Sequence, residues 1–184
     1  MKLPTQPKHE QRDSPRLKAL FLAQVQFQAN SAHDPHDVNG FKHAQTQFSL
    51  SVTKVSDDPT VKHRQVHLYV QLQRKDENDQ SEQPPYLGVI EVVAEVEFQA
   101  DATAGDELLN QISIWFTGSA LLGAARVYVD TITAIGPFPR TTFGIVNLGN
   151  VLAQATFTPA SLDAPSVPIY PELAEQIEAA QASS

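Results

Sequence analysis

Six histidines are the first residues of this 184-residue chain that could do chemistry, and they stand at positions 9, 33, 36, 43, 63 and 67. The stretch His33-Asp34-Pro35-His36-Asp37 offers nitrogen and oxygen ligands close together. A zinc site needs about four such groups converging on one point, and this spacing matches no metal-binding motif. We therefore interpret the stretch as a polar surface turn and predict no metal site.

A row of glutamates is the second candidate. Glu91, Glu95 and Glu97 share one side of a strand-like segment. Paired carboxylates perform acid–base catalysis when their surroundings push their pKa values apart. Only Val89 and Val93 are apolar on that side, so the pattern favours a solvated strand face over a desolvated pocket.

His63 and His67 also share the outward side of their own segment, as His43 does on another. The alternative for them is a protonation-sensitive patch near the ordinary histidine pKa of ~6.5. The chain has no nucleophile elbow, phosphate-binding loop or dinucleotide fingerprint. It also has no cysteine, which excludes disulfides, thiolate metal sites and cysteine nucleophiles. We predict a protein that is not an enzyme and uses no cofactor.

Charge and hydropathy narrow the classes of partner. The formal net charge is −8 and the pI is about 5.1, which is the wrong sign for counterion-driven binding to nucleic acid. Residues 1–16 lack the apolar core of a signal peptide, and no run approaches the ~20 apolar residues that span a bilayer. We expect a cytoplasmic protein that binds no nucleic acid and is not inserted in a membrane.

The elements that would position these residues form one domain. Residues 1–16 are polar and contain three prolines, which is typical of a flexible leader. Residues 17–160 carry the apolar patterns of a single core, and residues 161–184 form an acidic, proline-containing tail with a short helix expected over 171–180.

Four segments alternate apolar and polar residues with the period of a half-buried strand: 21–28, 44–53, 66–73 and 90–99. In the first, Phe21, Ala23, Val25 and Phe27 share one parity and glutamines take the other. Such alternation is typical of an antiparallel sheet that is covered on one face only.

After residue 100 the apolar period changes to that of a helix, with Leu108, Ile112 and Trp115 at i, i+4 and i+7. Because Gly118 and Gly123 interrupt the pattern, we expect two helical pieces, 106–117 and 119–135, with a stop at Gly136 and the proline that follows it. The predicted fold class is α+β, a four-stranded antiparallel sheet whose one apolar face is covered by a long C-terminal helix.

The helical region holds more apolar side chains than one sheet face can accept. Trp115 and Phe116 point about 100° apart on a helix, so we expect at least one to lie outside the core. A second apolar helix face predicts a homo-oligomer, dimer or tetramer. Candidate contact residues for a polypeptide or partner are Trp115, Phe116, Leu121, Leu122 and Phe138.

The stretch from Leu121 to Pro139, followed by 145–149, resembles the SecB protein-export chaperone family. The family has a Pro-Tyr-Ala-Arg-Glu step that opens its long helix, and this chain matches it at Ala125 and Arg126. The family's later Gly-Thr-Phe-Pro step is matched at Gly136, Phe138 and Pro139, and its Asn-Leu region is matched loosely by Asn147-Leu148. Gly123-Ala124 stand where the family has Pro-Tyr, and Val127 where it has Glu. The chain is also similar to uncharacterised SecB-like families of Gram-positive bacteria.

The resemblance implies a four-stranded antiparallel sheet packed on a long helix, oligomerisation through helices, and binding of extended non-native polypeptide along apolar grooves. It implies no cofactor. It also implies a structural role for Arg126, at the start of the helix or at an interface, and for the Gly136–Pro139 step.

The leading hypothesis is accordingly an ATP-independent chaperone, or peptide-binding module, that holds non-native polypeptide on apolar surface. One alternative keeps the fold but serves a single protein partner as an adaptor or regulator, for example a toxin–antitoxin component. Another, a small-molecule or metal-dependent enzyme, depends only on the histidines and the glutamate row.

Overall fold

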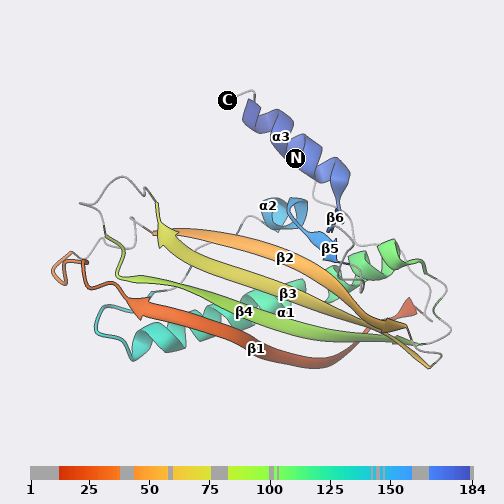
Figure 1. The fold of residues 1–184 in the computed structure, drawn as a ribbon, viewed down its shortest axis with the longest axis horizontal. Coiled ribbons are helices and arrows are strands. Elements are labelled where there is room, and N and C mark those ends of the chain that lie inside the picture. Colours follow the sequence, from red (N-terminus) through yellow and green to blue (C-terminus); the bar gives the residue numbers. More distant parts are fainter. Residues whose placement is uncertain are drawn as a thin grey trace.

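The computed structural model describes residues 13–37, 44–57, 60–75, 83–99, 102, 104–141, 143, 146, 148–158 and 166–182. One long helix lies across one face of a twisted sheet, and the other face is open (Figure 1). Of the expected leader, residues 1–12 lie outside the described residues. Asp13 is buried, and its side chain accepts the backbone N–H of Ala104 at 3.2 Å.

The sheet has six strands in the order β1-β4-β3-β2-β5-β6. Four long strands are antiparallel, as predicted: β1 (Arg16–Ala29), β2 (Ala44–Asp57), β3 (Val61–Arg74) and β4 (Tyr86–Gln99). The predicted four-stranded sheet is incomplete, however, because β5 (Thr156–Thr158) adds parallel to β2 and β6 (Val167–Pro168) adds antiparallel to β5. Strands of two and three residues carry too little periodicity for a sequence pattern to reveal them.

The strands have one apolar and one polar face, which we call the inner and the outer face. Val66, Leu68, Ile90 and Val92 are buried on the inner face. In β1 the predicted parity is wrong, because register shifts between Leu17 and Ala19 and between Leu22 and Gln24 turn side chains over. Phe21 pairs with Val93 on the outer face, whereas Val25 pairs with Ile90 on the inner face.

Helix α1 (Asp106–Ala134) is one continuous helix and packs chiefly on β3 and β4. The predicted break at Gly118 is wrong: a glycine costs a helix interior only about 1 kcal/mol, and packing on the sheet outweighs that. A buried stripe recurs every fourth residue along the helix, comprising Leu109, Ser113, Thr117, Leu121, Ala125, Val129 and Thr133. The buried Ser113, Thr117 and Thr133 hydroxyls donate to the carbonyl four residues earlier.

A buried arginine fixes the start of α1 to the sheet. Arg64 continues the inner-face row of β3, and its side chain has no exposed area. The guanidinium donates to Asp106 at 2.6 Å and to Asn110 at 3.2 Å, both in the first turns of α1. Lys54 of β2 also donates to Asp106, at 3.1 Å. Acidic groups in the first turn suit the positive end of the helix.

The C-terminal segment covers the β2 side of the inner face. After α1 the chain returns to α2 (Leu148–Ala153), β5, β6 and α3 (Pro171–Ala182), which projects from the body in Figure 1. Helix α3 begins where a terminal helix was predicted. The expectation that no run is long and apolar enough to span a bilayer is wrong, because α1 is so by length and composition. In this structure its buried stripe packs on the sheet.

Candidate polypeptide-binding surface

Trp115 and Leu122 line an apolar crevice between α1, α2 and the inner face of the sheet. Its volume is about 80 Å³. The other lining residues are Leu50 of β2, Leu68 of β3, Ile114, Gly118 and Ser119 of α1, and Val151 and Leu152 of α2. Only Ser119 among them has a polar side chain, so the crevice suits apolar side chains.

The crevice is bordered at Trp115 by a buried tyrosine from the C-terminal segment. Tyr170 is 9 % exposed, and burial raises the pKa of its hydroxyl to about 12, with the Trp115 N–H acting in the opposite direction. Among the described residues, neither Tyr170 Oη nor Trp115 Nε1 has a well-formed hydrogen bond, although both atoms are buried. Leaving buried polar groups without partners costs free energy.

The remaining predicted contact residues do not join this crevice. Phe116 is 45 % exposed and points away from Trp115, as the helical spacing requires. Leu121 has no exposed area because it belongs to the stripe that packs on the sheet, so it offers no contact surface in this conformation. Phe138 lies beyond the far end of α1, with its ring edge-on to His33 and Tyr86.

The residues carried by the family resemblance have structural surroundings. Arg126 lies in the second half of α1, not at its start, and its guanidinium covers the Phe143 ring at 5.3 Å from the centroid. Gly136 follows the helix, where a Cβ would lie 2.5 Å from Tyr86 Oη. Pro139 is exposed. The Tyr86 hydroxyl meets the carbonyls of Thr133 and Phe138 at 3.1 and 2.7 Å.

A second group of apolar side chains, which sequence reasoning found only in part, is left exposed by the fold. They are Leu17, Leu20 and Val25 on the inner face of β1, Phe116 and Val127 of α1, and Ile135 directly after it. We call these six residues the apolar band. Leu17 and Leu20 are 45 % and 38 % exposed because α1 hardly touches β1. Because β1 contains bulges, a simple alternation of apolar and polar residues could not predict which of its side chains lie on the inner face.

On the outer face, histidines and glutamates of neighbouring strands form a cross-paired, half-buried row. The side chains of His67 and Glu91 are only 19 % and 12 % exposed, so the predicted solvated face is wrong there. His67 Nδ1 lies 2.8 Å from Glu91, Gln65 donates to Glu95 at 3.0 Å, and Lys18 lies 3.0 Å from Glu97. The hydrogen bond from Lys18 holds the pKa of Glu97 below its ordinary value and raises the pKa of Lys18. Burial is the largest cause that raises the pKa of Tyr69, and the hydrogen bond with Glu91 and the charge of that carboxylate raise it further.

His33 is buried, so the predicted polar surface turn is wrong at this residue. Its Nδ1 lies 2.7 Å from the Gln83 carbonyl. Asn30 donates to the Gln83 side chain and to the Pro84 carbonyl, at 3.1 and 2.9 Å. These bonds join the end of β1 to the start of β4. His43 lies outside the described residues, and within them no three histidine, aspartate or glutamate side chains gather as a metal site would require.

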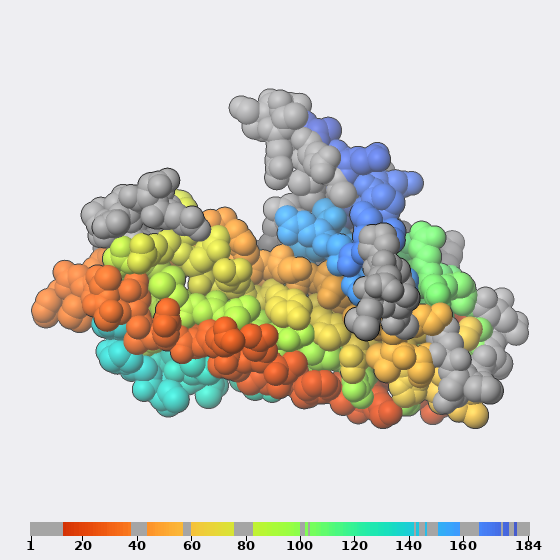
Figure 2. Space-filling model, in the orientation of Figure 1, coloured from red at the N-terminus to blue at the C-terminus, as the bar shows by residue number. Residues whose placement is uncertain are grey.

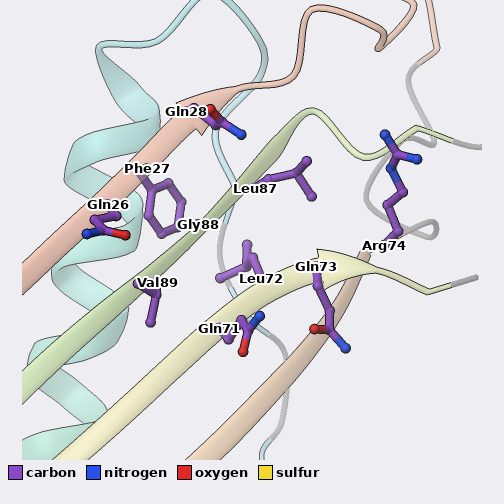
Figure 3. A pocket seen from close by; sticks show the side chains of 10 residues that line it. All are labelled: Gln26, Phe27, Gln28, Gln71, Leu72, Gln73, Arg74, Leu87, Gly88 and Val89. Atoms are coloured by element: carbon purple, nitrogen blue, oxygen red, sulfur yellow. The ribbon is translucent and has the colours of Figure 1, made fainter. Parts of the chain in front are cut away.

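Figure 2 shows the open outer face, with α1 behind the sheet. A wide hollow of about 760 Å³ lies at one end, where Leu87 and Val89 of β4 are flanked by glutamines of β1 and β3 (Figure 3). A second hollow, of about 720 Å³, adjoins it and reaches Val151 and Gln154. The first hollow is lined by glutamines and apolar residues with a single charged side chain, Arg74. The second is lined mainly by uncharged polar side chains. Neither lining therefore has the converging charged groups of a catalytic pocket.

No protein-family model matches the chain, and no curated protein sequence matches it. Among solved structures, the chain is similar to Rv1957, a SecB-like chaperone of Mycobacterium tuberculosis solved with a ChAD peptide from the HigA1 antitoxin, Rv1956. The TM-score is 0.53 at 17 % identity, over 72 % of this chain and 88 % of that one. A Streptococcus agalactiae protein of unknown function gives a TM-score of 0.46 at 14 % identity, over 72 % and 98 %.

At 17 % identity the likeness to Rv1957 concerns the fold alone. A long helix on an antiparallel sheet was expected from the apolar periodicity and from the resemblance around Arg126 and Gly136, and the four long strands and α1 of this chain have that arrangement. The fold of this protein is therefore SecB-like.

Proposed function

We propose that the protein is a cytoplasmic, ATP-independent chaperone that binds extended, non-native polypeptide along the Trp115 flank of α1. The observation that carries the proposal is the apolar crevice, in which Trp115 and Leu122 meet side chains of β2, β3 and α2. A solved protein of the same fold is a SecB-like chaperone in complex with a peptide. Apolar contacts contribute about 25 cal/mol per Å² buried, less the cost of ordering the bound chain.

We further assign the apolar band to association with a second copy of the chain. Around the helix, Phe116 and Val127 lie about 100° and 120° from Trp115, so polypeptide binding and self-association use different sides of α1. Contiguous exposed apolar surface of more than a few hundred Å² is uncommon on monomers. No reaction and no cofactor are part of this proposal.

An aggregation assay with a chemically denatured client tests the chaperone function. We expect molar excess of the protein to suppress light scattering, and Leu122→Ser to weaken that suppression severalfold by placing a hydroxyl in the crevice. Val55→Ser is the control, because Val55 of β2 is 47 % exposed and belongs to neither the crevice nor the apolar band. Unchanged aggregation with the wild-type protein would reject the chaperone function.

A dedicated adaptor for one protein partner is the second candidate. It is favoured by the small size of the crevice, about 80 Å³, which suits one defined side chain better than many different clients. Affinity capture separates the two: a single stoichiometric partner supports the adaptor, whereas a broad set of unfolded proteins supports the chaperone.

A further inference from the structure

The crevice is large enough for an apolar side chain but too small for a whole polypeptide segment. Sites for drug-sized ligands measure about 300–1,000 Å³, and a peptide segment needs at least as much. The crevice holds about 80 Å³. The flank of α1 that carries Trp115 must therefore become more open before a polypeptide can bind there.

The C-terminal segment 166–173, which we call the strap, restricts this flank. Ile169, Tyr170 and Leu173 of the strap are 4 %, 9 % and 5 % exposed and belong to the same apolar core as Trp115's neighbours. The strap also borders an open hollow of about 280 Å³, whose other side is formed by Glu107 and Gln111 of α1. Residues 107, 111 and 115 are one helical turn apart, so removing the strap would join this hollow to the crevice in one groove along α1.

The strap is held mainly as a bound peptide would be. Two of its residues pair with β5, and the Ile169 N–H donates to the Ala155 carbonyl at 2.9 Å. Ile169 and Tyr170 then bury an aliphatic and an aromatic side chain. Addition of an extended segment to a strand edge, with side chains in adjoining pockets, is a common mode of peptide recognition.

The contact between strap and helix is imperfect in one respect. Tyr170 Oη and Trp115 Nε1 are buried without a well-formed hydrogen bond among the described residues. Water or another ligand would satisfy both groups once the strap left, which lowers the cost of its release.

Resting on the proposed function, we propose that the strap is an internal ligand of the polypeptide site. An incoming extended segment with adjacent aliphatic and aromatic residues displaces it, pairs with β5 and places those side chains beside Trp115. A segment tethered to its own site competes at an effective concentration of the order of millimolar. The strap therefore selects against weakly bound or purely polar segments.

A reversible lock on the full-length chain tests this inference. Thr156 and Pro168 lie opposite each other in the β5–β6 pair, and the chain has no other cysteine, so Thr156→Cys/Pro168→Cys can form one cross-strand disulfide. The probe is a fluorescein-labelled synthetic peptide of residues 166–173, SVPIYPEL. We expect the reduced form to bind it at least tenfold more tightly than the oxidised form.

Controls identify the cause of any difference. The peptide SVPSSPEL, which lacks the aliphatic and aromatic side chains, should bind neither form. Ile169→Ser/Tyr170→Ser weakens the strap and should bind SVPIYPEL at least tenfold more tightly than the wild type. Val55→Ser, at a residue of β2 that is 47 % exposed and outside the strap and the crevice, should match the wild type. Circular dichroism confirms that each variant is folded.

The outcomes separate this inference from the proposed function. Equal affinity of the oxidised and reduced forms would overturn the role of the strap while leaving polypeptide binding intact. If neither folded form binds the probe and the wild type also fails to suppress aggregation, both proposals are rejected.

Discussion

Arg64 shows how one residue connects the sheet to the helix above it. Its side chain is fully buried, while that of Asp106 is 46 % exposed, so the guanidinium depends on its partners far more than the carboxylate does. Removing one partner of a buried charge is costly because the charge that remains is poorly solvated. The sequence places Arg64 on the apolar parity of β3, but alternation alone gave no reason to expect a buried charge there.

We expect Asp106→Ala to lower the free energy of unfolding by roughly 1.5–3 kcal/mol, the usual contribution of a hydrogen bond to a charged group. Lys54→Met removes the other cation beside Asp106, but that pair is partly exposed and its loss should cost less than about 1 kcal/mol. Urea unfolding followed by linear extrapolation measures both. Equal effects of the two substitutions would mean that Arg64 does not depend on Asp106.

At the scale of elements, the period of the apolar residues predicted strands and helix well, whereas glycines within the pattern did not predict where an element ends. The alternation around residues 44–53, 66–73 and 90–99 predicted β2, β3 and β4 correctly. Two bulges in β1 moved Phe21 to the outer face, because local backbone geometry decides where a strand gains a residue. Gly118 did not end α1, since a single glycine costs less than the packing of the buried stripe contributes.

Substitution by alanine should have opposite effects on stability at Gly118, within α1, and at Gly136, in the turn that follows it. A Cβ at Gly118 would meet nothing within 4 Å, so Gly118→Ala should raise the free energy of unfolding by up to about 1 kcal/mol. A Cβ at Gly136 would lie 2.5 Å from Tyr86 Oη, and Gly136→Ala should destabilise by about 1–3 kcal/mol through overpacking. Urea unfolding distinguishes them, and a loss of stability in Gly118→Ala would contradict the reading of an open helix face.

At the scale of the whole molecule, the sequence predicted the two-layer arrangement but only part of the surface. Trp115 and Leu122 could be chosen from composition and resemblance, and the structure brings them together. Phe138 could not be placed, because its position depends on Tyr86 and His33, which are distant in sequence. The docking of Ile169 and Tyr170 was equally hidden, since a two-residue strand pair has no sequence period.

The apolar band makes the assembly of the molecule testable. From Phe116 to Ile135 the sequence carries only two charged residues, Arg126 and Asp130, and the inner face of β1 also exposes Leu17 and Leu20. Burying these side chains against a second copy would remove apolar surface from water on both subunits. A charge placed within such an interface would have to be desolvated, which is costly without a partner.

We therefore expect light-scattering mass measurements to give a multiple of the 20.2 kDa chain mass for the wild type at micromolar concentration, and a mass close to that of one chain for Val127→Glu. Gln71→Glu adds the same charge on the outer face, away from the band, and should leave the wild-type mass unchanged. A wild type that is already monomeric would remove the band's assigned role. A Val127→Glu protein that keeps the wild-type mass would place the interface elsewhere. Because Val127 lines neither the crevice nor the hollow beside the strap, Val127→Glu should also leave the redox-dependent binding of SVPIYPEL intact in the locked background.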